Sequence, residues 1–479
     1  MLLSKSKYLI GLQCPKHLWL SVHEPSRIPE HDEGTQFRFS QGHLVGEMAK
    51  KVFLKGIDVP VDNFSENLKL SKKLLLKRKP LFEAAFIFEN LYSRADILNP
   101  VNKDEWDIIE VKSATKVKEP NVDDVAFQKY CYTKSGIKIR KCFLMHLNNK
   151  YVRDGEIDPK ELFTKTEITE EVNETDVKIN EVLKIMNLKK CPECLIGIHS
   201  TQPYECPLID ECWSGLPKNN VFELYSSGKK SFDLYDRGIE SIEDIPSDYK
   251  LTSNQMIQKE CSTGKVHIER SKIKEFLSTL EYPLYYLDFE TYSTAIPLYD
   301  GLKPYQHIPF QFSLHVDSKK SVKHHSFLSS LGDSRLEFLK ALKKVIGPKG
   351  SIVAYNQSFE KKILKLLSSM YPSYKGWIDS ILDRFVDLAV PFKEFYYYNP
   401  KQHGRWSIKY VLPALTGKDY SGLGIADGKT ASLEYMNMIH GPKQTKEEIS
   451  KIRADLEKYC KLDTEGMVWI VEKLGKITV

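Results

Sequence analysis

The sequence predicts an α/β protein made of two domains that are joined by a small helical connector. In both halves of the chain, short apolar runs rich in β-branched and aromatic residues alternate with amphipathic helical stretches. Between the halves lies a polar stretch with a helical pattern. A chain of 479 residues is long enough for two or three domains. We place the domains at residues 1–217 and 281–479, and the connector at residues 218–280.

The composition is that of a globular protein with a slight excess of positive charge. Lys and Arg number 70 against 64 Asp and Glu, which gives a net charge of +6. This excess is compatible with binding a polyanion but is too small to establish it. Apolar runs stay well short of the roughly 18 residues that a membrane helix needs, so we expect a cytoplasmic protein without a membrane partner.

The stretch Leu284–Thr291 places two carboxylates inside an apolar run. Asp288 and Glu290 stand two residues apart, so the alternation of a β-strand puts both side chains on one face. Like charges in a half-buried strand repel each other and lose hydration, and a divalent metal ion would neutralise them. The alternative is an edge strand on which both carboxylates face solvent.

Two further carboxylates of this half lie on predicted helices. Glu360 begins an apolar stripe that continues through Ile363 and Leu367, although the preference for acidic residues at a helix start would also explain it. Asp463 lies in the middle of the apolar seam of the last helix, where a buried charge requires a partner. Tyr459 stands four residues earlier, one helical turn away.

The first half carries a separate set of acidic residues on two consecutive predicted strands. Pro80–Leu98 predicts a hairpin whose second arm carries Asp96, and Glu105–Ser113 predicts a strand with Glu110 and Lys112 on one face. Two carboxylates and an ammonium group can bind a metal ion and polarise an attacking water. The alternative is a surface ion pair along one strand.

Two predicted helices accompany these strands. Residues 123–136 predict a helix on which Gln128 and Tyr132, four residues apart, share a face. Gln41–Phe53 predicts another helix with His43 near its beginning, and a single helical His is usually structural.

The order of helix, hairpin, strand and helix resembles the PD-(D/E)XK nucleases of the RecB-like type, over about residues 1–217. The resemblance implies a restriction-endonuclease-like fold that cleaves phosphodiester bonds with Mg²⁺ or Mn²⁺. In such relatives a helical His joins the metal site, and the Gln and Tyr help to position the phosphodiester. The residues implied are Asp96, Glu110, Lys112, Gln128 and Tyr132, with His43 as a further metal ligand.

Four of the nine cysteines are clustered, which indicates a metal centre rather than disulfides. RecB-like relatives often carry a four-iron four-sulfur cluster held by one early and three late cysteines. The ligands that this resemblance implies are Cys14, Cys194, Cys206 and Cys212. Ser200 occupies the position expected for the first late cysteine, so the upstream pair Cys191-x-x-Cys194 would have to donate the missing thiolate. A zinc site formed by the four late cysteines, or free thiols, remain alternatives.

The acidic residues of the second half resemble the DnaQ-like DEDDy 3'-5' exonucleases of the ribonuclease H fold, over about residues 281–474. The motifs are Asp288-x-Glu290, Asn356-x-x-x-Glu360 and Tyr459-x-x-x-Asp463, and Glu360 stands where the family usually has Asp. The resemblance implies that the four carboxylates hold two Mg²⁺ or Mn²⁺ ions while Tyr459 orients the attacking water.

Three residues are additional candidates in this half. Asp387 is a further acidic group, ranked below the others. Trp406 and Lys409 could line the path of the substrate by stacking and by charge, or could serve packing.

Together the two resemblances point to a bacterial family that pairs these domains. We expect a nuclease with two metal-dependent sites that acts on nucleic acid, with DNA favoured over RNA and a helicase or a DNA repair or defence complex as partner. The competing hypothesis is a scaffold with degenerate sites that only holds nucleic acid or a helicase.

Overall fold

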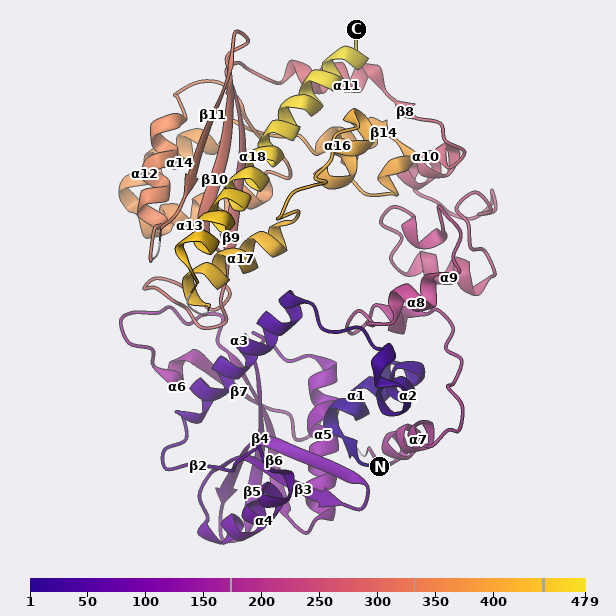
Figure 1. The fold of residues 1–479 in the computed structure, drawn as a ribbon, viewed down its shortest axis with the longest axis vertical. Helices are drawn as coiled ribbons and strands as arrows, with labels where there is room; N and C mark the ends of the chain where they lie inside the picture. Colours follow the sequence, from indigo (N-terminus) through magenta and orange to yellow (C-terminus); the bar gives the residue numbers. More distant parts are fainter. Residues whose placement is uncertain (173–174, 331, 442–443) are drawn as a thin grey trace. The chain divides into compact units, whose positions relative to one another are not determined.

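The computed structural model of the protein describes residues 1–172, 175–330, 332–441 and 444–479 (Figure 1). The structure is mixed α/β, as the sequence predicts, and the chain divides into two compact units. The first unit comprises Met1–Gly215 and Thr294–Gln306, and the second comprises Leu216–Ser293 and His307–Val479. The predicted connector, residues 218–280, belongs to the second unit. Within the described ranges, no helix combines the length and the apolar character that a membrane span requires.

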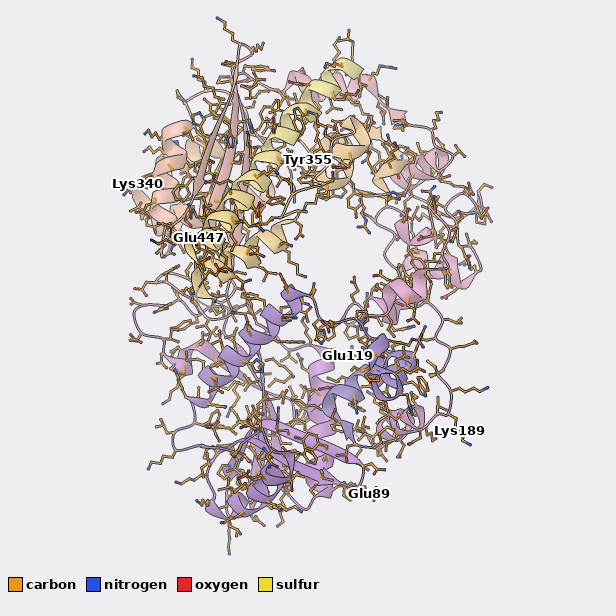
Figure 2. All side chains as sticks on the ribbon, viewed as in Figure 1. Glu89, Glu119, Lys189, Lys340, Tyr355 and Glu447 are labelled. Carbon is orange, nitrogen blue, oxygen red and sulfur yellow. The ribbon has the colours of Figure 1, made fainter. Side chains whose placement is uncertain are left out.

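The first unit is built on a seven-stranded sheet in the order β2-β3-β4-β5-β6-β7, with β1 paired to β4. Its strands are β1 (Leu3–Ser4), β2 (Ile57–Asp58), β3 (Leu81–Phe88), β4 (Leu91–Val101), β5 (Glu105–Lys112), β6 (Lys138–Leu147) and β7 (Phe163–Glu167). Strands β3 and β4 form the predicted antiparallel hairpin, which turns at Glu89 and Asn90 (Figure 2). The β5 and β6 strands are parallel, so the chain between them must cross over, and α5 does this.

The helices of the first unit are α1 (Lys5–Gln13), α2 (Pro15–His23), α3 (Glu33–Lys50), α4 (Phe64–Leu74), α5 (Glu119–Lys134), α6 (Pro159–Leu162), α7 (Asp176–Met186) and α8 (Ile209–Trp213). The apolar pattern predicts one helix from Ser4 to Leu20, but the structure has two, because Cys14 is extended (φ −147°, ψ 112°). A residue that precedes proline is disfavoured in the helical region, and Pro15 follows Cys14. The break leaves the Cys14 thiol free to cap α2.

The second unit contains a five-stranded sheet in the order β11-β10-β9-β12-β13. These strands are β9 (Leu284–Tyr292), β10 (Ile308–Asp317), β11 (Val322–Leu328), β12 (Ile352–Ala354) and β13 (Phe385–Asp387), and a separate pair is formed by β8 (His267–Ile268) and β14 (Tyr397–Tyr398). The central strand β9 is antiparallel to β10 and parallel to β12. The buried strand predicted at Leu284–Thr291 therefore lies in the middle of the sheet and not at an edge.

The helices of the second unit are α9 (Lys229–Asp236), α10 (Ser253–Cys261), α11 (Arg270–Ser278), α12 (Arg335–Val345), α13 (Ser358–Met370), α14 (Lys375–Leu382), α15 (Val390–Lys393), α16 (Ile408–Thr416), α17 (Gly428–His440) and α18 (Lys446–Ile477). The long helix α18 starts with a capping box between Thr445 and Glu448, close to Glu447 (Figure 2). The sequence of residues 232–246 predicts a helix, a turn and a second helix, and only the first helix is present. Helix α9 ends before the turn at Gly238, and turns follow it.

The loop between β9 and β10 contributes a segment, Thr294–Gln306, to the first unit. The Ala295 amide donates to Gln41 Oε1 on α3 at 2.9 Å, and the Ala295 side chain is fully buried in the core of that unit. The Arg153 guanidinium donates to the carbonyls of Pro297 and Leu298 at 3.0 and 2.7 Å. The sequence places this segment in the second domain by position, whereas the contacts group it with the first unit.

Candidate functional site

The central strand and two helices of the second unit bring four carboxylates together, and we call them the carboxylate site. Strand β9 carries Asp288 and Glu290, α13 carries Glu360 near its start, and α18 carries Asp463. Burial and repulsion from Asp463 raise the pKa of Asp288 to about 8. Burial, together with repulsion from Asp288, also raises the pKa of Glu290 and of Glu360. The four residues predicted from three distant motifs are therefore neighbours.

The carboxylate site is short of compensating positive charge. Glu290, Glu360 and Asp463 are only 7%, 3% and 6% exposed. The Oε2 atom of Glu360 finds no hydrogen-bond partner among the described residues. The charge of Lys409 only partly opposes the rise in the pKa of Glu290, and its ammonium group donates to the Ala426 carbonyl at 2.6 Å. Because buried unpaired carboxylate oxygens are costly, this donor set fits one or more hard divalent cations such as Mg²⁺ or Mn²⁺.

Two tyrosines contact Asp463. The Tyr420 hydroxyl donates to Asp463 Oδ1 at 2.5 Å, and Tyr459 is also within hydrogen-bonding reach of this carboxylate. The Lys409 ammonium lies 5.6 Å from the Tyr420 ring centroid and 5.3 Å from that of Tyr459. The periodicity of the last helix predicts Tyr459. Tyr420 lies in a loop where no pattern marks it, and only the structure shows it.

A thiol adjoins the carboxylate site. Cys460 Sγ lies 3.6 Å from Asp288 Oδ2, and ligand atoms of Asp288, Glu290 and Cys460 all lie within 4.8 Å of one another. The surroundings are apolar and acidic, so burial and the nearby carboxylates raise the pKa of Cys460. The group is therefore held as a neutral thiol beside the acidic strand.

Asp387 has a structural position next to this site. Its Oδ1 accepts from the Asn356 amide at 2.8 Å and from the Ala389 amide at 3.0 Å. Asn356 has a left-handed conformation (φ 67°) directly before α13. Asp387 thus fixes the turn that starts the helix carrying Glu360. Trp406 is bound through its backbone, because its carbonyl accepts from the Tyr355 hydroxyl.

The first unit gathers a polar group around Glu110, which we call the Glu110 site. Glu110 Oε1 accepts from Lys112 at 2.6 Å and from Lys5 at 2.7 Å, and Oε2 accepts from Gln128 at 2.7 Å. Asp124 joins from α5, accepting from Lys112 at 2.6 Å and from Gln128 at 2.9 Å. Burial alone would raise the pKa of Glu110, but the two ammonium groups hold it well below its usual range.

Asp96 flanks Glu110 on the neighbouring strand β4. Its Oδ2 accepts from the Val111 amide at 2.7 Å, which ties the carboxylate to the edge of β5. Burial and repulsion from Glu110 raise the pKa of Asp96 to about 7. The predicted Asp96, Glu110, Lys112 and Gln128 are therefore brought together.

Two predicted members lie apart from the Glu110 site. The Tyr132 hydroxyl donates to the Ala84 carbonyl and accepts from the Ala95 amide. This side chain therefore connects α5 to both strands of the β3–β4 hairpin. His43 is exposed on α3, and nothing in the described part of the chain links it to the carboxylates. Lys5 and Asp124 are the members that sequence reasoning missed. Lys5 lies at the start of the chain, and Asp124 precedes Gln128 by one helical turn, which was the available signal.

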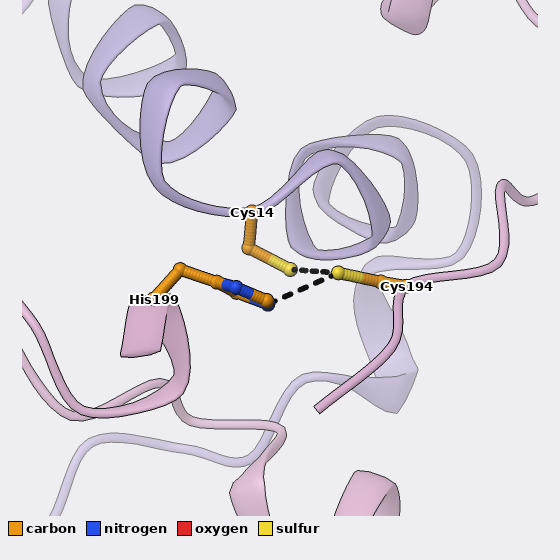
Figure 3. A group of neighbouring side chains, drawn as sticks. All are labelled: Cys14, Cys194 and His199. Atoms are coloured by element: carbon orange, nitrogen blue, oxygen red, sulfur yellow. Dashed lines mark hydrogen bonds between the residues drawn. The ribbon is translucent and has the colours of Figure 1, made fainter. Parts of the chain in front are cut away.

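Four cysteines of the first unit and a histidine line a small cavity, and Figure 3 shows three of these side chains. Cys14 Sγ and Cys194 Sγ lie 3.8 Å apart, and Cys194 Sγ lies 3.1 Å from His199 Nε2. The cavity is also lined by Ser200, Cys206 and Cys212. The resemblance implied the four cysteines, and the structure places them in one group. His199 was missed, although it directly precedes the unexpected Ser200.

Comparison with known proteins finds similarity to a domain family and to a mycoplasma protein. A family model described as a domain of unknown function (DUF2779) matches residues 285–407, which include most of β9 and all of α13. The chain is also 28% identical over 236 residues to "Uncharacterized protein MG366" of Mycoplasma genitalium. That alignment covers 42% of this chain and 33% of the relative, so the chain spans about a third of the length of the protein that it matches.

Proposed function

We propose that the second unit hydrolyses phosphodiester bonds of nucleic acid at the carboxylate site, as a 3'-5' exonuclease. The observation that carries this proposal is the convergence of Asp288, Glu290, Glu360 and Asp463 in one buried place. An isolated structural role would pair each carboxylate with a donor, whereas here burial and repulsion raise the pKa values of Asp288 and Glu360, and Glu360 Oε2 finds no partner among the described residues.

Each group of residues in the carboxylate site has a separate role in the proposed reaction. Divalent ions held by the four carboxylates would acidify a water and offset charge on the phosphate. In this proposal the Tyr459 hydroxyl orients that water, while the Tyr420 hydroxyl fixes the rotamer of Asp463 through its hydrogen bond to Oδ1. Lys409, beside both rings, contributes positive charge where the polyanionic substrate would enter.

The sheet of the second unit supports a ribonuclease H-like assignment. Its acidic pair lies on the central strand of a mixed five-stranded sheet, and helices from two later parts of the chain bring Glu360 and Asp463 to that strand. The matched domain model spans Asp288, Glu290 and Glu360. Glu360 in place of the usual Asp adds one methylene, and its side chain is buried beside Asp288.

For the first unit we propose a RecB-like PD-(D/E)XK nuclease domain, supported by the grouping of Asp96, Glu110, Lys112 and Gln128. One observation favours a second candidate there. Glu110 already holds three hydrogen bonds, two of them from ammonium groups, so a metal ion would have to displace Lys5 from Oε1. A degenerate site that only holds nucleic acid or a partner is therefore the alternative for this unit.

We propose DNA rather than RNA as the substrate, and a helicase or a DNA repair or defence complex as the partner of such a nuclease. The test uses the purified full-length chain with Mg²⁺ or Mn²⁺ and end-labelled single- and double-stranded DNA and RNA. We expect shortening from the 3' end that EDTA and Asp288→Asn abolish. The matched control is Asp379→Asn, an exposed aspartate of α14. Binding without any cleavage under both metal ions would favour the scaffold.

A further inference from the structure

The cysteine group of the first unit contains an imidazole that the cysteine pattern does not predict. His199 Nε2 lies 3.1 Å from Cys194 Sγ, and ligand atoms of Cys14, Cys194 and His199 all lie within 4.8 Å of one another (Figure 3). His199 sits in a one-turn 3-10 helix, Ile198–Ser200, and Gln13 donates to its carbonyl at 2.8 Å. The backbone of His199 is thus held next to the break between α1 and α2.

The distance between the sulfur atoms distinguishes a site for a single metal ion from a site for an iron-sulfur cluster. Two thiolates bound to one tetrahedral zinc at ~2.3 Å are separated by ~3.8 Å. Cys14 Sγ and Cys194 Sγ are 3.8 Å apart. In a four-iron cluster each thiolate binds its own iron, so the sulfurs lie further apart than the ligands of one ion do.

A late cysteine can supply the fourth donor. Cys206 is 6% exposed, lines the same cavity as Cys14, Cys194 and His199, and packs in one cluster with Cys14. Cys212 instead has Lys16 Nζ at 3.6 Å, which balances its sulfur with a protein cation. Cys191 is half-buried beside the group and lies outside the cavity lining.

We propose that His199 is a metal ligand, and that Cys14, Cys194, Cys206 and His199 form a mononuclear tetrahedral zinc site in the first unit. In this site the His199 imidazole replaces the cysteine ligand that a four-cysteine centre would have at position 200. Zinc binding then joins the helix break at Cys14 to the segment 194–206, and so contributes to the folding of this unit independently of any nuclease activity.

The test measures metal content and ligand field on the full-length chain. We expect about one zinc per chain and no acid-labile sulfide, the stoichiometry of a mononuclear Cys₃His site. After exchange with Co²⁺, visible bands of tetrahedral cobalt and sulfur-to-metal charge transfer should appear. His199→Ala should weaken Co²⁺ binding at least about tenfold, and His199→Cys should retain the metal with its bands shifted to longer wavelength. His31→Ala, an exposed histidine of the same unit, and Cys191→Ser should leave metal and spectrum unchanged.

Three results would overturn the proposal. Iron and sulfide in near-equal amounts in protein purified without oxygen would show a cluster. An unchanged cobalt spectrum and affinity in His199→Ala would remove the imidazole from the ligands. If His199→Ala does not fold, His199→Cys decides the matter, because a ligand exchange must shift the cobalt bands whereas a packing change leaves them in place.

Discussion

Asp463 combines burial with an acceptor role, and its substitution by Asn separates metal binding from packing. Asn keeps the shape of the side chain and an oxygen that can accept from Tyr420. If the carboxylate holds metal, Asp463→Asn should lower the exonuclease rate by about 100-fold or more, because a charge is lost from the site. The metal-free variant should be as stable as the wild type or more so, since one of several repelling carboxylates is gone.

The measurements for Asp463→Asn are the rate of 3'-end cleavage and the melting temperature in EDTA. Glu457→Gln is the matched control, because Glu457 is exposed on the same helix. Near-normal cleavage in Asp463→Asn would remove Asp463 from the catalytic residues.

At the residue scale, the sequence predicts those site residues that share one face of a strand or a helix. Asp288 with Glu290, and Tyr459 with Asp463, were found because strands and helices repeat their faces at two and at three to four residues. Lys5, Tyr420 and His199 reach their sites from the chain start, from a loop and from a single 3-10 turn. No period connects such residues with their partners, so only tertiary structure could reveal them.

At the scale of elements, β9, α13 and α18 bring together carboxylates whose negative charge is not balanced by nearby cationic side chains of the described residues. The pKa of Asp463 is raised to about 6 by burial and that of Asp288 to about 8, whereas in an unfolded chain both titrate near 4. The folded metal-free chain therefore holds more protons than the unfolded one between these values. Its free energy of unfolding should fall as pH rises from about 4 through about 8.

Divalent ions take the place of those protons, so we expect Mn²⁺ to raise the melting temperature by several degrees more at about pH 8 than at about pH 5.5. Thermal unfolding in Mn²⁺ and in EDTA at the two pH values measures this difference. The Asp288→Asn variant should show a smaller dependence. An equal rise at both pH values in the wild type would contradict metal binding by these carboxylates.

The turn before α13 leads to a second prediction at this scale. Asp387→Ala removes two hydrogen bonds from the amides of Asn356 and Ala389 and should cost about 1–3 kcal/mol of stability. It should also lower cleavage by displacing the start of the helix that carries Glu360. Asp387→Asn retains an acceptor oxygen and should be close to normal in both assays, unlike Asp288→Asn.

The control for this prediction is Asp383→Ala, an exposed aspartate just before β13. If Asp387→Asn were as inactive as Asp288→Asn while remaining folded, Asp387 would be a metal ligand and not a positioning residue.

The elements themselves were easier to predict than their ends. The hairpin at β3 and β4 and the strand β9 follow from alternation, and their positions agree with the sequence prediction within a few residues. The break at Cys14 was missed because the apolar pattern runs through it, although the following proline signals it. The prediction of a second helix after Gly238 was wrong, because a short polar segment lacks an apolar stripe that would distinguish a helix from a turn.

At the scale of the whole molecule, the carboxylate site and the Glu110 site draw their residues from different units. Glu110→Ala should therefore leave 3'-end cleavage by the second unit unchanged, and Asp288→Asn should leave any activity of the first unit unchanged. Cleavage of 3'-labelled and of circular DNA by each variant, with circular dichroism to show folding, measures this. Loss of all cleavage in either folded variant would require a single composite site.

The path of residues 294–306 sets the order in which the protein can form during its synthesis. The first unit cannot close over Ala295 until Gln306 has left the ribosome, 91 residues after Gly215. At ordinary translation rates this is a delay of roughly 5–20 s, during which the face of α3 that contacts Ala295 stays uncovered. Strand β9 emerges in that interval before its neighbours β10 and β12 exist. The nascent chain therefore holds two unfinished apolar surfaces at once, and it is in this period that a chaperone has the most to protect.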